Sequence, residues 1–187
     1  MRSTSALPIA VAAALALAGG SAQAQTTKAS AEQLRRGQYL VEYGGCHDCH
    51  TPKTMTPKGP APDKTRLLSG HPQTSQVPAV PSGVLAPDKW VAMTNNDLTA
   101  WAGPWGVSFA ANLTPDKETG LGAWTRDQFV KSMRTGKHLG VGRPILPPMP
   151  WWALAGLTDQ DISAVFAYLQ SLPALRNKVP EPIPAPK

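Results

Sequence analysis

The sequence contains only two cysteines, and both lie in the five-residue run Cys46-His47-Asp48-Cys49-His50. Cysteines three positions apart cannot cross-link distant parts of a chain, so a small domain held together by disulfides is excluded. The run follows an expected helix and precedes a proline-rich stretch. The grouping of two thiols and an imidazole must therefore be explained by its own spacing.

This spacing, C-x-x-C-H (the CxxCH motif, residues 46–50), is the attachment signature of c-type haem. Two thiols so placed can form thioethers with both vinyl groups of one porphyrin, and His50 then offers its imidazole as the proximal iron ligand. A structural disulfide leaves His50 unexplained, and a thioredoxin-like redox pair requires a strand before the motif instead of a helix. A zinc site requires a second cluster of ligands, whereas His71 and His138 are isolated in the sequence. We predict one covalently bound haem c, with its iron.

The first 24 residues have the features of a secretory signal peptide. Arg2 supplies a positive charge, residues 6–18 are apolar, and Ala22-Gln23-Ala24 is a small-x-small cleavage site. The alternative is an uncleaved membrane anchor, for which the apolar run is short. The sequence predicts export to the periplasm, a mature chain of residues 25–187, and no stable membrane span after cleavage.

Residues 25–187 suffice for one domain of ordinary size. The whole chain has a formal charge of +6 and a sequence pI of about 9.6. Its basic residues are scattered and form no stripe interleaved with aromatics, so nucleic acid is not an expected partner. The positive charge favours protein partners with an acidic docking surface, through an attraction that weakens as salt rises.

Capping patterns and apolar periodicity predict three helices. These begin at Ser30, Thr125 and Thr158 and end near Tyr43, Gly136 and Leu172. Residues 51–110 contain nine of the 20 prolines, three tryptophans and no convincing alternation of polar and apolar side chains. We expect an ordered but irregular insertion there, and a proline-rich tail over residues 173–187.

The distal iron ligand decides what a haem can do. Met or His on both faces suits electron transfer, whereas a vacant position permits chemistry with peroxide or gases. Met149 is the predicted distal ligand, because prolines on both sides fix the backbone around it. Met133 lies on a helical face and is expected to fill the core. Met93, His138 and, more weakly, His71 remain alternatives.

The ordered segments together resemble the single-haem class I cytochromes c. The resemblance rests on the helix that runs into the CxxCH motif, on the proline-flanked Met149, and on the closing helix over residues 157–172. Residues 111–138, ANLTPDKETGLGAWTRDQFVKSMRTGKH, look like a periplasmic bacterial branch of larger cytochromes c.

The resemblance implies a mainly α, cytochrome c-like helical fold around one haem, with residues 51–110 as an insertion in a single domain. In that family the first and last helices cross beside the haem, at a small residue on one and an aromatic on the other. The positions that match this crossing are Gly37, Val41, Val165 and Tyr168.

The predicted function is that of a periplasmic one-electron carrier, with Cys46 and Cys49 attached to the porphyrin and with His50 and Met149 on the iron. It is expected not to be an enzyme and to have no catalytic residues. A dehydrogenase is the expected donor, and an oxidase or another cytochrome the expected acceptor. Similar haem domains occur as electron-accepting subunits of periplasmic dehydrogenases, which is the first alternative. An open-site haem peroxidase is the second.

Overall fold

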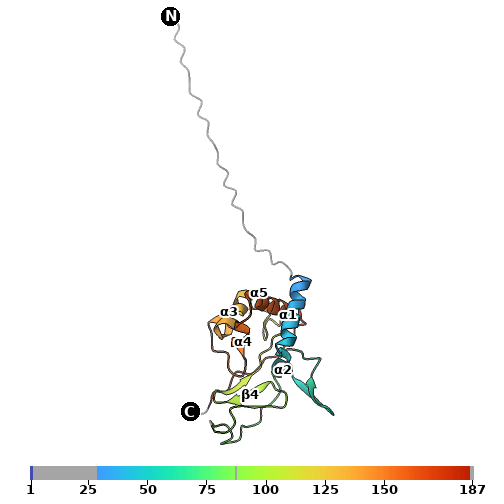
Figure 1. Ribbon diagram of the computed structural model, residues 1–187, viewed down its shortest axis with the longest axis vertical. Helices are drawn as coiled ribbons and strands as arrows, with labels where there is room; N and C mark the ends of the chain where they lie inside the picture. The colour runs from blue at the N-terminus through green and yellow to red at the C-terminus, as the bar shows by residue number, and fades with distance from the viewer. Residues whose placement is uncertain (2–28, 87, 186–187) are drawn as a thin grey trace.

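The computed structural model describes residues 1, 29–86 and 88–185. This part of the chain contains five α-helices, one 3₁₀ turn and five short strands (Figure 1). The predicted signal peptide lies outside the described residues apart from Met1.

All three helices expected from the capping patterns are confirmed. They are α1 (Ala31–Tyr43), α3 (Arg126–Thr135) and α5 (Asp159–Ser171). At each N-terminus the predicted cap side chain, of Ser30, Thr125 or Thr158, accepts a hydrogen bond from the backbone N–H three residues further on. These bonds satisfy donors that a helix leaves free in its first turn.

The prediction of a mainly α, cytochrome c-like helical fold is wrong. The structure is 31% helical and 15% strand, and that helical share is ordinary for a mixed globular protein. A hairpin pairs β1 (Lys53–Thr56) with β2 (Gly59–Pro62). A second antiparallel sheet has the order β3 (Met93–Thr94), β4 (Ala100–Gly103) and β5 (Gly106–Phe109).

All five strands therefore lie within residues 51–110, which had been expected to be irregular. The strands are two to four residues long, too short to show an alternating pattern. Several positions are Gly, Ala or Pro, such as the GPAP of β2, which carry little strand signal. Two further helices were also not predicted, α2 (Cys46–His50) and α4 (Trp151–Ala155), because five residues are too few for a helical period.

Helices α1 and α5 cross in direct backbone contact at Gly37. A Cβ atom built on Gly37 would lie 2.0 Å from the carbonyl oxygen of Ala164 and 2.7 Å from the Cβ of Tyr168. An ion pair between Arg36 Nε and Asp161 Oδ1, at 2.8 Å, spans the same crossing. Gly37 is thus required for the close approach of the two helices, at a position that the sequence had marked as a crossing.

The hydrophobic core lies between α1, α3 and α5 and includes two residues from loops. Its buried members are Val41, Leu68, Leu121, Phe129, Met133, Ile162, Val165, Phe166 and Leu169. Met133 is among them, as expected for a core methionine.

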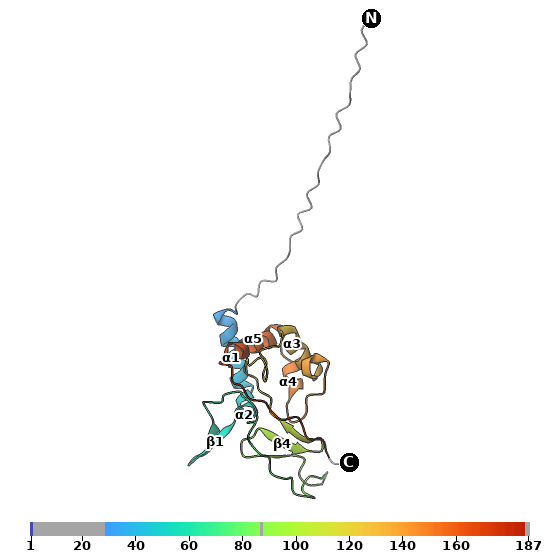
Figure 2. The same ribbon diagram turned by 180° about the vertical axis from the view of Figure 1, so that it is seen from behind.

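The helices and the larger sheet occupy opposite ends of the described chain. Figures 1 and 2 show α3, α5 and the upper part of α1 at one end and the sheet around β4 at the other. Between these ends, α2 and α4 lie on opposite sides of the molecule, and the β1–β2 hairpin projects outward beside α2. This arrangement places the CxxCH motif of α2 across the middle of the molecule from α4.

The proline-rich tail after α5 is held against the rest of the protein. Asn112 Nδ2 donates to the carbonyl of Leu175 at 2.8 Å, and Asn177 Nδ2 donates to the carbonyl of Ser69 at 2.7 Å. Further on, Ile183 exchanges two backbone hydrogen bonds with Val107 of β5. The tail therefore links the helical end to the sheet.

Within the described residues, every helix is too short or too polar to cross a membrane.

The packing at Gly37 predicts that Gly37→Val destabilises the protein. The added methyl groups must force α1 and α5 apart, and overpacking of this kind costs about 1–3 kcal/mol. Urea unfolding followed by circular dichroism measures the loss. Arg35→Ala, on the exposed side of the same helix, is the control and should change stability by no more than about 0.5 kcal/mol. Equal stabilities of the two variants would contradict the crossing described here.

Candidate haem-attachment site

The CxxCH motif forms α2, which follows α1 after a two-glycine turn. Gly45 has a φ of +66°, a left-handed conformation that disfavours residues with a Cβ. A Cβ there would also lie 2.7 Å from Asp48 Oδ2. The turn therefore depends on glycine at position 45, and it redirects the chain so that Cys46 packs against the hydrophobic core.

His50 is buried, with 8% of its surface exposed, and its ring is oriented by one hydrogen bond. Its Nδ1 lies 2.8 Å from the carbonyl oxygen of Ala111. A carbonyl only accepts, so Nδ1 carries the proton and Nε2 keeps its lone pair. Burial lowers the pKa of His50 and so favours the neutral ring. A neutral imidazole whose second nitrogen is held by a carbonyl is the form in which histidine binds metals.

The Nε2 atom of His50 makes no hydrogen bond within the described residues. Among the described residues, no buried side-chain nitrogen or oxygen lacks a hydrogen-bond partner. His50 Nε2 has no such partner in that part of the chain, so it must reach an accessible surface. The side chain therefore keeps an unused lone pair on Nε2, which fits the role of an axial haem ligand.

Both cysteines are unbonded and only partly exposed. Burial raises the pKa of the Cys46 thiol to about 11 and also raises the pKa of Cys49. Redox-active CxxC pairs have a lowered thiol pKa instead. The electrostatics of the pair thus argue against a thioredoxin-like function and leave both thiols available for thioether formation.

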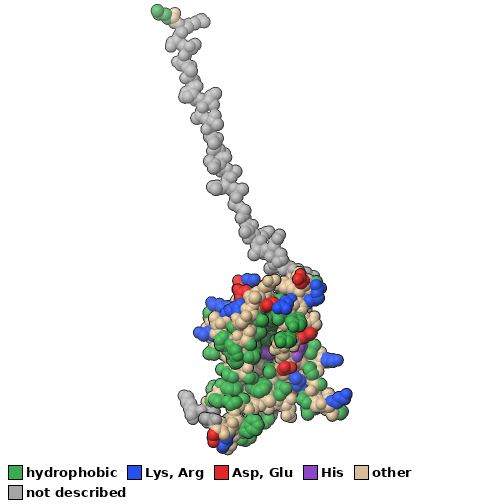
Figure 3. Space-filling model, in the orientation of Figure 1, with side chains coloured by type: hydrophobic (Ala, Val, Ile, Leu, Met, Phe, Trp, Pro, Cys, Tyr) green, Lys and Arg blue, Asp and Glu red, His purple; other side chains and the backbone are tan. Residues whose placement is uncertain are grey.

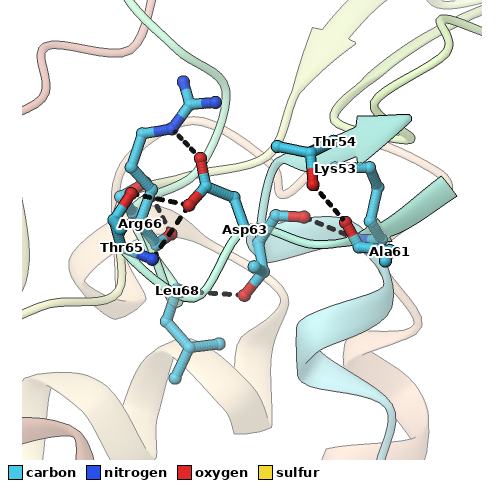
Figure 4. Close-up of polar contacts among 9 residues, drawn as sticks. Lys53, Thr54, Ala61, Asp63, Thr65, Arg66 and Leu68 are labelled. Carbon is cyan, nitrogen blue, oxygen red and sulfur yellow. Dashed lines mark hydrogen bonds and ion pairs between the residues drawn. The ribbon is translucent and has the colours of Figure 1, made fainter. Parts of the chain in front are cut away.

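The loop after the motif is fastened to it by hydrogen bonds. Thr51 Oγ1 accepts from the backbone N–H of Leu68 at 2.9 Å and is hydrogen-bonded to His47 Nδ1 at 2.9 Å. The N–H of Gly70 donates to the carbonyl of His50 at 2.8 Å. The path of this loop is set in turn by Asp63, which accepts from Thr65 and Arg66 (Figure 4).

Met149 is half-buried and lies just before α4. Its carbonyl accepts from the N–H of Trp151 at 2.9 Å, and Ser108 Oγ donates to the nearby carbonyl of Pro147 at 2.6 Å. The indole of Trp151 lies against Gly136 at the end of α3, where a Cβ would clash with the ring at 2.4 Å. The methionine segment is therefore held from both the sheet and the helical end.

Helix α4, which follows Met149, and the CxxCH helix α2 lie on opposite sides of the middle of the molecule (Figures 1 and 2). Figure 3 shows that one face is hollowed near its centre, with hydrophobic side chains around the hollow and histidine atoms at its edge. An apolar hollow with histidine at its edge fits a planar apolar ring such as porphyrin.

The other residues considered as distal ligands have different surroundings. His71 is fully buried, and both of its ring nitrogens are bonded, Nδ1 to Thr99 Oγ1 at 2.9 Å and Nε2 to the carbonyl of Ser75 at 3.3 Å. His138 is exposed, with its ring edge-on to Trp124 at 4.9 Å. Met93 is half-buried on β3 beside a cavity of about 260 Å³, which Trp90 also lines.

Sequence reasoning missed two groups at the site. The carbonyl of Ala111 orients His50, but a backbone acceptor leaves no mark in the sequence. Lys53 was also missed, although its Nζ donates to three carbonyls at the end of the motif. The only sign of this role in the sequence is the position of Lys53, a single basic residue directly after Thr51 and Pro52.

Comparisons with known proteins identify relatives that cover most of the chain, although no protein-family model matches it. One subunit of the nicotinate dehydrogenase of Pseudomonas putida is 29% identical over 151 residues, 81% of this chain. The cytochrome c subunit of a quinone alcohol dehydrogenase from Gluconobacter oxydans is 27% identical over 170 residues, 89% of the chain. The cytochrome c subunit of gluconate 2-dehydrogenase from Pantoea cypripedii is 28% identical over 135 residues, 72% of the chain.

The matched parts amount to only 10%, 27% and 22% of the lengths of these three relatives. Two of the three are cytochrome c subunits of dehydrogenases. These likenesses support the prediction of a c-type cytochrome.

The burial of His71 makes stability depend on pH. Burial lowers the pKa of His71, so below about pH 6.5 the unfolded chain binds a proton that the folded protein does not. The free energy of unfolding should therefore fall as the pH is lowered from 7.5 to 5.5. Urea unfolding of His71→Gln should show a smaller fall than the wild type, by up to about 1.4 kcal/mol per pH unit. Identical pH dependence of the two proteins would show that His71 titrates normally.

Proposed function

We propose that this protein is a c-type cytochrome that passes single electrons and serves as the haem-bearing acceptor of a dehydrogenase. The observation that carries the proposal is His50, whose Nδ1–H is held by the Ala111 carbonyl while Nε2 stays open, directly after two unbonded thiols. The likeness to cytochrome c subunits of dehydrogenases supports the same conclusion.

Each residue of the site has a separate task in this proposal. Cys46 and Cys49 would hold the haem through thioether bonds, so the cofactor could not dissociate. His50, oriented by Ala111, would bind the iron, and Met149 would be its second protein ligand. The haem supplies the redox chemistry, since its iron alternates between Fe(II) and Fe(III).

The relatives favour a dehydrogenase partner over an independent carrier. Two of them are named as cytochrome c subunits of alcohol or gluconate dehydrogenases, and we extend that association to this chain. The main prediction from sequence, a free carrier, has no comparable support. We also propose that the chain is exported by residues 1–24 and acts in the periplasm.

The part of the chain that carries Met149 is suited to bind an acidic partner. Residues 128–158 contain no Asp or Glu, and their basic residues are Lys131, Arg134, Lys137 and Arg143. Val141 and Trp152 are exposed in the same segment, at 70% and 59%. Arg134 is ion-paired with Asp159, so the positive charge left to a partner comes from the three other residues. Basic residues in the same segment as exposed apolar ones are a composition that electrostatically guided interfaces share.

Size-exclusion chromatography of an extract from the native host tests the partnership. We expect the haem absorbance to elute at the mass of a complex and to be reduced when the substrate of the co-eluting dehydrogenase is added. A haem protein that elutes at the mass of a monomer, with no dehydrogenase activity in its fractions, would favour the free carrier.

The proposed Met149 ligand predicts a defined change on substitution. Wild-type ferrous protein should not bind carbon monoxide, because both axial positions are filled. Met149→Ala opens one position, so the variant should bind carbon monoxide, and its ferric form should lose the weak far-red band of methionine ligation. Met133→Leu, a buried core change, is the control and should leave both spectra as in the wild type. Carbon monoxide binding by the wild type would favour the peroxidase alternative.

A further inference from the structure

The C-terminal end of α2 has a carbonyl that the helix itself cannot satisfy. In an α-helix the carbonyl of each residue accepts from the N–H four residues later. For Asp48 that residue is Pro52, which has no N–H. The helix is only five residues long, so the unsatisfied end lies within one turn of His50.

The side chain of Lys53 provides the missing hydrogen-bond donor for the carbonyl of Asp48. Its Nζ donates to the carbonyls of His47 and Asp48, each at 2.9 Å, and to the carbonyl of Thr51 at 2.6 Å. Three acceptors require three N–H donors, which only a protonated ammonium provides. A full positive charge is therefore held beside the turn that carries His50.

The backbone of Lys53 is also held in place, by strand pairing in the β1–β2 hairpin. Lys53 is the first residue of β1 and pairs with Pro62 of β2. The adjoining N–H of Asp63 donates to the carbonyl of Pro52 at 2.8 Å. Figure 4 shows Lys53 next to Thr54 on one strand of this hairpin, with Ala61 of the other strand across from Thr54. The projecting hairpin thus serves to hold an ammonium group against the end of α2.

We propose that Lys53 is a positioning residue for the proximal ligand and sets the reduction potential of the haem. The inference rests on the proposed function, because it takes His50 as the iron ligand. By joining three carbonyls, Lys53 keeps α2 wound and fixes His50 relative to the two cysteines. Its charge also disfavours Fe(III), which carries one more positive charge than Fe(II), so the potential is higher with Lys53 than without it.

Potentiometric titration of Lys53→Met, Lys53→Arg and the wild type, all purified with haem attached, tests the proposal. Lys58→Met is the matched control, since Lys58 lies in the exposed turn of the same hairpin. It removes the same charge without touching α2. A wild-type protein without haem would refute the proposed function itself, before any comparison of potentials.

The expected result is a lower midpoint potential for Lys53→Met than for both the wild type and Lys58→Met, with Lys53→Arg closer to the wild type. Equal potentials for Lys53→Met and Lys58→Met would overturn the proposal. If Lys53→Met accumulates without haem, its potential cannot be measured, and haem attachment in Lys53→Arg becomes the test of the proposal. Haem attachment restored by arginine supports the role of the cation, whereas failure of both variants overturns it.

Discussion

The hydrogen bond from His50 Nδ1 to the carbonyl of Ala111 joins two segments that are far apart in the sequence and fixes the ring that faces outward. The rest of the site depends on it, because a histidine free to rotate could not present Nε2 in one direction. The bond also selects the tautomer. Burial acts in the same sense, since it lowers the pKa of His50 and favours the neutral imidazole. Orientation and protonation state thus have a common cause in the packing around α2.

The helical end provides a rigid support for this arrangement. α1 and α5 touch at Gly37, and α2 follows α1 after a glycine turn, so the crossing determines where the motif begins. The tail then returns from α5 to the sheet through Asn177 and Ile183. A short helix of five residues has little stability of its own, and its position is imposed by these neighbours.

The sequence predicted well what local chemistry determines. Ser30, Thr125 and Thr158 are caps in the structure because a side-chain oxygen before a helix has one dominant role. The strands of residues 51–110 were missed because their pairing depends on partners elsewhere and many of their side chains are small or proline. The mainly α prediction failed for this reason. It had set residues 51–110 apart as an irregular insertion, whereas all five strands of the described residues lie there.

The residues expected to bind the haem covalently could be predicted from the sequence. The groups that hold those residues in place could not. C-x-x-C-H indicates its chemistry by spacing alone, and the likeness to cytochrome c subunits agrees with it. The Ala111 carbonyl and the Lys53 ammonium act through contacts made only after folding. Met149 remains a prediction, and mutation must test it.

The central claim is that Cys46 and Cys49 bind haem covalently, and mass spectrometry of the denatured protein tests it most directly. After expression in a host that attaches haem c, the polypeptide should carry the mass of one haem, and the double variant Cys46→Ala/Cys49→Ala should carry none. A wild-type chain that has the bare polypeptide mass under these conditions would contradict the claim.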